Sequence, residues 1–322
     1  ATLSDTDTTS VVGAELVTNG TFATDLTGWT TNGSPSVSSG QAVLPSANDS
    51  IRQSITTVVG KSYTFAIGVA DGSNDNSIRV GSTEFGTQYF LVTDQTAATT
   101  LSSSFTATTT TTYIFIEQAG AASNSLIVDN VSVRLAEEDR SVNGNGLQVF
   151  GTITKTVVET GADLVGYSGF SASNYLEQPF NSSLDFGTGD FCYMGWFKWA
   201  SGTGFMFDRA DTDGNRRISV YTNHSSGEVI FYTETANAGG GSLAANVWSH
   251  WVVVRRSGVF YGYQDGVQVA TFVDAGSKTS NDATAVLKVG VRYNNANPLG
   301  GSVALFRASA TAPTAAQIAK IY

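Results

Sequence analysis

Short apolar runs separated by turn residues recur along most of the chain, and this spacing restricts the fold more than any other feature. The runs cover residues 51–59, 63–70, 89–93, 113–117, 126–135, 192–199, 218–222, 229–235, 248–255, 259–264, 267–272 and 285–291. Runs of this length, bounded by Gly, Asn, Asp and Ser, are typical of antiparallel strands. In residues 131–135 apolar and polar side chains alternate, as in a strand with one face in a core. The pattern predicts an all-β protein.

Two local signals are more specific. Asp265-Gly266 lies between two apolar runs and predicts a two-residue hairpin, because a type I′ turn needs a positive φ at both central positions. Thr314 and Gln317 form a capping box, and apolar residues at helical spacing follow it. This predicts one short C-terminal helix. Residues 248–254 are apolar on both faces, which favours a strand that is covered on both sides.

The length of the chain indicates two domains. With 322 residues, each half could bury a core of its own. Residues 136–146 are first charged and then rich in Gly and Asn, so we expect a surface linker there. We expect a flexible segment at 1–10 and domains at 11–135 and 147–322. The predicted fold is two tandem antiparallel β-sandwiches with a short C-terminal helix.

Charge and composition exclude some partners. The net charge is −10 and no cluster of Lys and Arg occurs, so we expect no nucleic acid partner. No window approaches the roughly 18 consecutive apolar residues of a membrane span, so we expect no membrane insertion. The single cysteine, Cys192, lies in an apolar run and is expected to be a buried free thiol.

The first half contains Asn19-Gly20-Thr21-Phe22, then Gly28-Trp29, and ends in Ile127-Val128-Asp129-Asn130. This order resembles the jelly-roll carbohydrate-binding modules attached to xylanases and cellulases, and their relatives in phage tail proteins. The resemblance implies a structural calcium held by Asn19, Phe22 and Asp129. The acidic residue that often follows the Phe is replaced by Ala23, so Asp25 or backbone carbonyls would have to substitute. No other cofactor is expected.

The second half contains several segments of another family. They are Gly195-Trp196-Phe197, residues 246–253, the hairpin at residues 261–268, residues 300–306 and the helix start at residues 312–314. Together they resemble the laminin-G-like, concanavalin-type jelly rolls. The joining stretch 138–155 resembles a segment that precedes such domains in phage structural and tail-fibre proteins. Both folds have many functions, so the resemblance does not identify a ligand.

Sugar-binding residues are sought among loop aromatics beside amide groups, because a flat ring with nearby hydrogen-bonding groups suits a sugar. The candidates are Tyr293, Asn294, Asn295, Asn297, Tyr89 and Trp29. Trp29 follows Gly28 at a position that the related modules bury, so a core position is favoured for it over a sugar-binding one. Tyr293 could equally be a packing residue.

We expect no enzymatic activity. Glycoside hydrolysis needs a pair of carboxylates in a cleft, whereas Glu228, Glu234, Asp208 and Asp213 are scattered over strand ends and turns. The chain has two histidines, and His250 lies between tryptophans in a predicted strand, where burial is expected.

Residues 208–215 carry the densest group of oxygen ligands, three aspartates and an asparagine. Such a loop could hold calcium. An Asp-Gly pair between strands is first of all a hairpin turn, which we expect here.

The resemblances to phage proteins imply a virion-surface or tail-fibre structural protein of a bacteriophage. It would contact other virion proteins, self-associate and adhere weakly to cell-surface glycans. The alternative is a secreted bacterial adhesin, or accessory modules of a glycoside hydrolase. In either case the protein would act on a virion surface or outside the cell.

Overall fold

The computed structural model describes residues 11–120, 125–137, 145–162, 164–215, 218–223, 226–279 and 284–322. They divide into two compact units. Ala14–Ala136 form the first unit, and residues 11–13 join Glu137–Tyr322 in the second. The predicted flexible segment 1–10 and residues 138–144 of the predicted linker lie outside the described residues.

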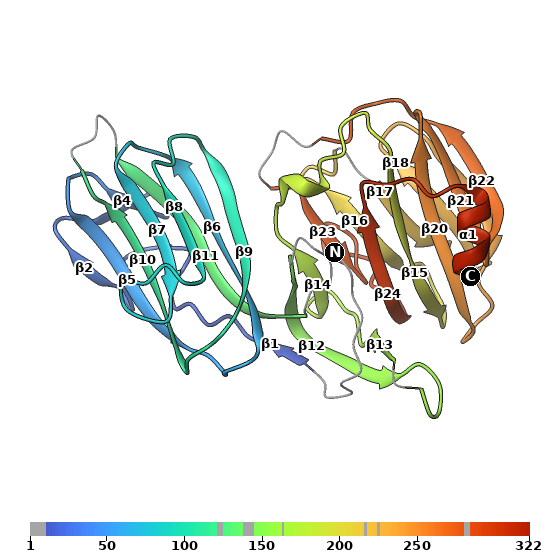
Figure 1. Cartoon of the computed structure of the whole chain (residues 1–322), viewed down its shortest axis with the longest axis horizontal. Coiled ribbons are helices and arrows are strands. Elements are labelled where there is room, and N and C mark those ends of the chain that lie inside the picture. The colour runs from blue at the N-terminus through green and yellow to red at the C-terminus, as the bar shows by residue number, and fades with distance from the viewer. Residues whose placement is uncertain are drawn as a thin grey trace. The chain divides into compact units, whose positions relative to one another are not determined.

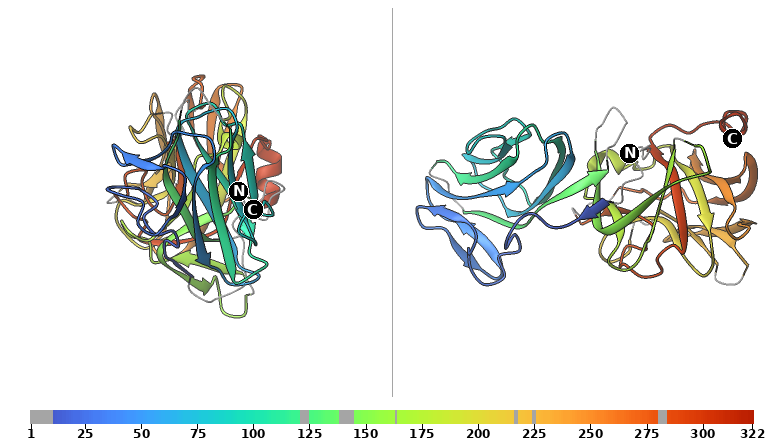
Figure 2. Two further views of the ribbon diagram at one scale, coloured as in Figure 1. Left: turned by 90° about the vertical axis from the view of Figure 1, so that its left-hand side faces the viewer. Right: turned by 90° about the horizontal axis from the view of Figure 1, so that it is seen from below.

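Both units are sandwiches of antiparallel strands, so the predicted fold class is confirmed. Figures 1 and 2 show two layers of strands in each unit. Helical structure within the described ranges is limited to α1 (Ala315–Ile321) and the 3-10 turn η1 (Ser182–Leu184). Neither of these is long and apolar enough to span a lipid bilayer.

The first unit packs two sheets face to face. One has the strand order β2–β5–β10–β7–β8, and the other has the order β3–β4–β11–β6–β9. The strands are β2 (Thr30–Asn32), β3 (Ser36–Ser38), β4 (Gln41–Leu44), β5 (Asp49–Thr56), β6 (Ser62–Asp71), β7 (Asn76–Gly81), β8 (Phe90–Thr93), β9 (Thr99–Thr106), β10 (Thr111–Gln118) and β11 (Leu126–Glu137).

The second unit also has two sheets. The α1-side sheet has the order β13–β24–β15–β20–β21–β22, and the opposite sheet has the order β12–β14–β23–β16–β17–β18–β19. The strands are β1 (Val11–Gly13), β12 (Leu147–Val157), β13 (Val165–Ser168), β14 (Tyr175–Gln178), β15 (Phe191–Trp199), β16 (Phe205–Ala210), β17 (Ile218–Thr222), β18 (Glu228–Thr233), β19 (Asn237–Ser242), β20 (Trp248–Arg256), β21 (Val259–Gln264), β22 (Val267–Val273), β23 (Val286–Val289) and β24 (Gly301–Ser309).

Strand β12 belongs to both sheets because it bends. Residues 148–150 pair with β14, and residues 154–157 pair with β13. Gly151 lies between them with a φ of 62°, a left-handed conformation that Gly adopts readily. β1 pairs with the same strand, so the prediction that placed residues 11–13 in the first domain is wrong. The domain to which residues 11–13 belong is decided by their pairing with β12, a distant segment, and a sequence pattern does not show such pairing.

The predicted linker begins too early. Ala136 and Glu137 continue β11, and both are buried. Glu137 Oε1 lies 3.4 Å from Lys155 Nζ, and Glu137 Oε2 accepts a hydrogen bond from the Tyr167 hydroxyl at 3.1 Å. The expectation that these two residues run on the surface is wrong, because the carboxylate has buried partners.

The alternation of side chains along the strands sets the two cores. In the first unit the buried side chains of β11 include Leu126, Val128, Val131 and Val133, and the loop residue Phe22 packs its ring 5.4 Å from that of Trp29. In the second unit Tyr193 of β15 and Phe207 of β16 stack at 4.7 Å, which joins the two sheets. Each sheet therefore buries one face against its partner.

The local turn and helix predictions are confirmed. Asp265 and Gly266 have φ values of 50° and 79° and connect β21 with β22. Thr314 Oγ1 accepts a hydrogen bond from Gln317 N at 3.3 Å, and Gln317 Oε1 accepts one from Thr314 N at 2.8 Å. This capping box starts α1.

Strands that are poor in apolar residues were missed by the pattern. Strand β9 reads TTLSSSFT and β19 reads NAGGGS. In β19 a Cβ at Gly240 would lie 2.1 Å from Val269 O, and one at Gly241 would lie 2.6 Å from Trp251 Cη2. The glycines therefore let β19 run close to β22.

Helix α1 covers part of the outer face of the α1-side sheet (Figure 1). Ile318 is fully buried against Cys192, Met194, Val252 and Val254. Cys192 is a buried free thiol, as expected, and burial raises its pKa to about 12. The thiol is therefore not poised to act as a nucleophile.

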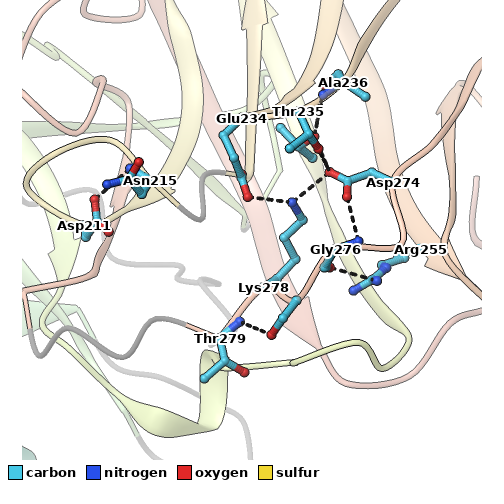
Figure 3. Close-up of polar contacts among 12 residues, drawn as sticks. Asp211, Asn215, Glu234, Thr235, Ala236, Arg255, Asp274, Gly276, Lys278 and Thr279 are labelled. Carbon is cyan, nitrogen blue, oxygen red and sulfur yellow. Dashed lines mark hydrogen bonds and ion pairs between the residues drawn. The ribbon is translucent and has the colours of Figure 1, made fainter.

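Several charged side chains of the second unit form a network of hydrogen bonds and ion pairs (Figure 3). Asp274 Oδ2 accepts hydrogen bonds from Lys278 Nζ at 2.8 Å and from the hydroxyls of Thr233 and Thr235. Lys278 Nζ also donates to Glu234 Oε1 at 3.0 Å, and the lysine is fully buried. The network ties the turn after β18 to the segment after β22.

The network changes the acidity of Asp274. Burial would raise the pKa of its carboxyl, but hydrogen bonds from Lys278, Thr233, Thr235 and the Gly276 N–H outweigh burial. The pKa of Asp274 is therefore held well below its ordinary value. A carboxyl whose pKa is lower in the folded state stabilises that state above its unfolded pKa and loses this effect as the pH falls.

Trp251→Ala should lower the free energy of unfolding of the second unit by about 3–5 kcal/mol, because it opens a cavity in the core. Trp251 is 2% exposed, and its ring lies 5.7 Å from Phe231. Chemical denaturation measures the change. Val267→Ala is the control, since Val267 is 66% exposed and should change stability by no more than about 0.5 kcal/mol. An unchanged midpoint for Trp251→Ala would mean that the tryptophan is not in the core.

Asp274→Asn should destabilise the second unit at pH 7 by about 3 kcal/mol, because it breaks a buried ion pair. Lys278 would keep only its second partner, Glu234. The wild type should lose stability as the pH falls below about 4, where free aspartate takes up its proton, and the variant should lose less. Denaturation midpoints between pH 7 and pH 2 test this. Asp213→Asn, at an exposed turn, is the control and should show the same pH dependence as the wild type. If Asp274→Asn and the wild type lost stability equally in acid, the lowered pKa of Asp274 would be contradicted.

Candidate functional site

A groove of about 350 Å³ lies on the outer face of the α1-side sheet. We call it the tryptophan groove, and its lining residues are Val158, Glu159, Leu164, Trp196, Trp248, Ala304 and Leu305. They come from the loop between β12 and β13 and from strands β15, β20 and β24. Glu159 carries the single carboxylate among these lining residues.

Trp248 is held in place by the loop between β12 and β13. Its Nε1 donates a hydrogen bond to Val158 O at 3.1 Å. Gly166 makes room for the ring, because a Cβ there would lie 2.9 Å from Trp248 Cζ2 and Cη2. The indole N–H is therefore engaged within the protein, and the half-buried ring contributes its apolar surface to the groove.

Trp196 is held from the side of α1. Its ring centroid lies 5.8 Å from that of Tyr322, in a stacked arrangement, and 5.3 Å from that of His250. His250 is buried, as expected, and burial lowers the pKa of its imidazole. A neutral imidazole therefore supports Trp196 at neutral pH, and the indole is half-buried beside the groove.

The groove combines two indoles, aliphatic side chains and one exposed carboxylate. Indole rings bind flat apolar surfaces, including the C–H faces of sugar rings, and a carboxylate accepts hydrogen bonds from hydroxyl groups. This arrangement is suited to binding. A pair of carboxylates for acid–base chemistry is not found among the lining residues.

The predicted loop around Tyr293 lies beside the opposite sheet. Tyr293 N donates to Asp208 Oδ2 of β16 at 3.0 Å. A Cβ at Gly214 would lie 2.9 Å from Tyr293 Cζ, and the Arg292 guanidinium lies 5.1 Å from the tyrosine ring. The ring is half-buried by its neighbours, so its stacking on a sugar stays a prediction.

The three asparagines of this loop shape a tight turn. Asn295 and Asn297 have φ values of 61° and 48°, a conformation that Asn tolerates. Asn295 Oδ1 accepts a hydrogen bond from Lys288 Nζ at 2.6 Å, and Asn294 Oδ1 accepts one from Ala296 N at 3.2 Å. Asn294 and Asn297 are exposed, so their amides remain sugar-binding candidates.

The other two aromatic candidates lie in the first unit. Trp29 is 7% exposed, and its Nε1 donates to Asn19 O at 3.2 Å. Its prediction as a sugar-binding residue is wrong, because the ring is part of the core. Tyr89 is stacked on Phe105 at 4.6 Å, and its hydroxyl accepts a hydrogen bond from Thr108 N at 2.8 Å. One face of the Tyr89 ring is therefore covered.

The predicted calcium ligands near Asn19 are engaged in hydrogen bonds. Asn19 Nδ2 donates to Asp25 O at 2.8 Å and to Thr27 O at 3.1 Å. Asp25 Oδ1 accepts a hydrogen bond from Thr27 N at 2.9 Å, and the hydrogen bonds from Thr27 lower the pKa of Asp25. The Asn19 amide and the Asp25 carboxylate are thus engaged in hydrogen bonds within their own loop.

Asp129 and Phe22 do not complete the set. Asp129 Oδ1 accepts a hydrogen bond from Asn130 N at 2.7 Å, and burial raises the pKa of Asp129. Phe22 could offer only its carbonyl, since its side chain is in the core. No group of three or more His, Cys, Asp or Glu side chains with metal-binding geometry occurs among the residues that the structure describes. Calcium takes 6–8 oxygen ligands, which the four predicted residues do not supply in this arrangement, so the structure lends the predicted site no support.

The aspartate-rich segment forms a turn, as expected. Asp211 Oδ1 accepts hydrogen bonds from Asp213 N at 3.1 Å and Asn215 N at 2.7 Å (Figure 3). Gly214 has a φ of 81°, and its N–H donates to Asp211 O at 3.0 Å. The buried Asp211 carboxylate therefore stabilises the turn.

Sequence reasoning missed both tryptophans of the groove. Residues 248–254 were expected to be covered on both faces, and Trp196 was noted only as part of a family motif. Alternation along β15 could have placed Trp196 on the same outward face as Cys192 and Met194. Nothing local in the sequence shows that α1 covers those two residues and leaves Trp196 at the edge.

Chelation with EDTA should leave the melting temperature of the first unit unchanged, because the hydrogen bonds around Asn19 and Asp25 already satisfy the oxygens there. Asn19→Ala should destabilise this unit by about 1 kcal/mol through the lost hydrogen bonds. Differential scanning calorimetry with and without 1 mM calcium, about a physiological extracellular level, measures both. A melting temperature that rises with calcium and falls with EDTA would establish the calcium site, because a ligand that binds only the native state stabilises it.

Comparisons with known proteins agree with this architecture. The model of the concanavalin A-like lectin/glucanases superfamily matches residues 170–319. No curated protein sequence matches the chain significantly.

Similar solved structures include domain 4 of AbnA, an extracellular arabinanase from Geobacillus stearothermophilus, with 18% identity and a TM-score of 0.43 over 53% of this chain and 81% of that one. A heptameric SAP-like pentraxin from Limulus polyphemus has 17% identity and a TM-score of 0.37 over 46% of this chain and 74% of that one. The binding domain of Paraclostridial Mosquitocidal Protein 1 has 11% identity and a TM-score of 0.44 over 57% of this chain and 48% of that one. The residues that match the family model, 170–319, lie within the second of the two observed sandwiches.

Proposed function

We propose that the second unit binds carbohydrate in the tryptophan groove. The observation that carries this proposal is the placement of Trp196 and Trp248, two half-buried indoles, on one groove of about 350 Å³. Ligand sites are concave and mostly apolar with few polar groups, and this groove has that composition. A glycan would lay the C–H face of a sugar ring on the indoles.

Glu159 supplies the polar contact. It is exposed at the groove and can accept hydrogen bonds from sugar hydroxyls. One such contact and two rings support modest affinity for a single site. Several copies on one assembly would convert it into strong retention, because linked sites raise the effective concentration.

The proposed activity is binding without catalysis. Hydrolysis of a glycosidic bond requires two carboxyl groups about 5–10 Å apart on either side of it. Glu159 has no second carboxylate beside it among the lining residues, and Asp274 and Glu137 are engaged in buried ion pairs elsewhere. These features favour a binding module.

The proposed setting is the surface of a phage particle, where the protein would contact other virion proteins and copies of itself. This proposal rests on the resemblance of residues 138–155 to segments of tail-fibre proteins. A secreted bacterial adhesin, or accessory modules of a glycoside hydrolase, is the alternative. Immunogold electron microscopy of the native source separates them, because label on particles supports the first and label on cells or on a hydrolase supports the second.

Trp196→Ala and Trp248→Ala should each weaken glycan binding at least about tenfold, roughly 1.4 kcal/mol, because each removes a stacking surface. Affinity electrophoresis in gels that contain neutral β-glucan, xylan or galactan measures the change. Trp199→Ala is the matched control. Trp199 is also a half-buried tryptophan of β15, but its Nε1 bonds to Gly202 O and it does not line the groove.

Tyr293→Ala tests whether the binding site is the tryptophan groove or the loop around Tyr293 that the sequence analysis indicated. It should leave binding unchanged if the groove is the site. Loss of binding in Tyr293→Ala together with normal binding in both groove variants would move the site to the loop. Failure of the wild type to be retained by any of these polysaccharides would overturn the proposed function.

A further inference from the structure

Leu305 has an unusual backbone conformation for its residue type. Its φ is 50°, in the left-handed region. Among the described non-glycine residues with positive φ, all but Leu305, Phe22 and two serines are Asn or Asp, which adopt this conformation more easily. The left-handed conformation costs free energy for a leucine, so something must favour it.

Packing explains Phe22 but not Leu305. Phe22 is fully buried in the core of the first unit, where its ring contacts Trp29. Leu305 is 37% exposed. Core burial can therefore offset the strain at Phe22, whereas Leu305 holds an apolar side chain in a strained conformation at the surface.

A β-bulge in β24 creates this conformation. Met194 of β15 pairs with Arg307, and Trp196 pairs with Ala304, so Leu305 and Phe306 together lie opposite Gly195. The extra residue reverses the alternation of side chains. Phe306 is fully buried in the core, while Ala304 and Leu305 both line the tryptophan groove.

The bulge thus places an aliphatic side chain next to Trp196 in the groove. We propose that Leu305 is a ligand-contacting residue that determines specificity in the groove, and that its strain is retained because it serves binding. This inference rests on the proposed carbohydrate-binding function. The ligand class is a neutral glycan whose apolar C–H face meets Leu305 and the two indoles.

The charge around the groove is consistent with a neutral ligand. Glu159 carries the one charge among the lining residues, and the other lining side chains are aliphatic groups or indole rings. Apolar contacts, including that of Leu305, must therefore contribute most of the selectivity.

Two variants separate the side chain of Leu305 from its backbone strain. Leu305→Ala removes the aliphatic contact and keeps the strain, whereas Leu305→Gly removes both, because glycine adopts positive φ without steric cost. Isothermal titration calorimetry with hexasaccharides of β-linked glucose, xylose and galactose measures affinity, and calorimetric melting measures stability. Val267→Ala, at an exposed valine outside the groove, is the control.

Both Leu305 variants should bind the preferred hexasaccharide at least about tenfold more weakly than the wild type. Leu305→Gly should melt at or above the wild-type temperature and above Leu305→Ala. Wild-type affinity in both variants, with binding lost in Trp196→Ala, would overturn the role of Leu305 and leave the proposed function intact. A melting temperature of Leu305→Gly several degrees below that of the wild type would also overturn it, because packing would then explain the conformation. Absence of wild-type binding to every hexasaccharide would overturn this inference and the proposed function together.

Discussion

Part of the outer face of the α1-side sheet is apolar. The position of α1 on this face determines which apolar side chains are buried and which stay accessible to a ligand. Alternation along β15 and β20 places Cys192, Met194, Val252 and Val254 on this face, away from the core between the sheets. A sheet face of this kind must be shielded from water. Helix α1 has seven residues, a length of about 10 Å, and neighbouring strands lie about 4.8 Å apart, so the helix shields only part of the sheet. Trp196 and Trp248 lie where this cover ends.

The tryptophan groove is therefore a consequence of incomplete cover, and its walls are fixed from two sides. Tyr322 and His250 support Trp196, and the Val158 carbonyl holds Trp248. Rings that are held in this way lose little conformational freedom when a ligand binds, which favours affinity. The bulge at Leu305 adds an aliphatic side chain at a cost in backbone strain. Strained residues that packing does not explain are frequent at functional sites. Leu305 differs from other exposed apolar residues because it both has a strained backbone and lines the groove.

Buried ion pairs hold separate segments of the second unit together. Lys278 joins Asp274 and Glu234, and Lys155 joins Glu137. Such pairs add little net stability compared with apolar packing, but breaking one leaves a buried charge without its partner. The carboxylates of these pairs are consequently structural. The sequence pattern placed Glu234 at a strand end or turn, where an isolated acidic residue is usually exposed.

Features that depend on neighbouring residues could be predicted from the sequence alone. Alternating apolar residues specify strands, Asp265-Gly266 specifies a hairpin through the φ values that it allows, and Thr314 with Gln317 starts a helix through two local hydrogen bonds. The all-β class followed from these local rules.

Features that depend on contacts between distant segments were decided by the tertiary structure. Trp29, Trp196 and Trp248 are equally apolar in the sequence, yet the first lies in a core and the other two line a groove. The difference arises because Asn19 and Phe22 enclose Trp29, whereas Ile318 of α1 packs on Cys192, Met194, Val252 and Val254 and not on the other two tryptophans. Burial of an aromatic ring is set by what packs against it, and a local pattern carries no information about that partner.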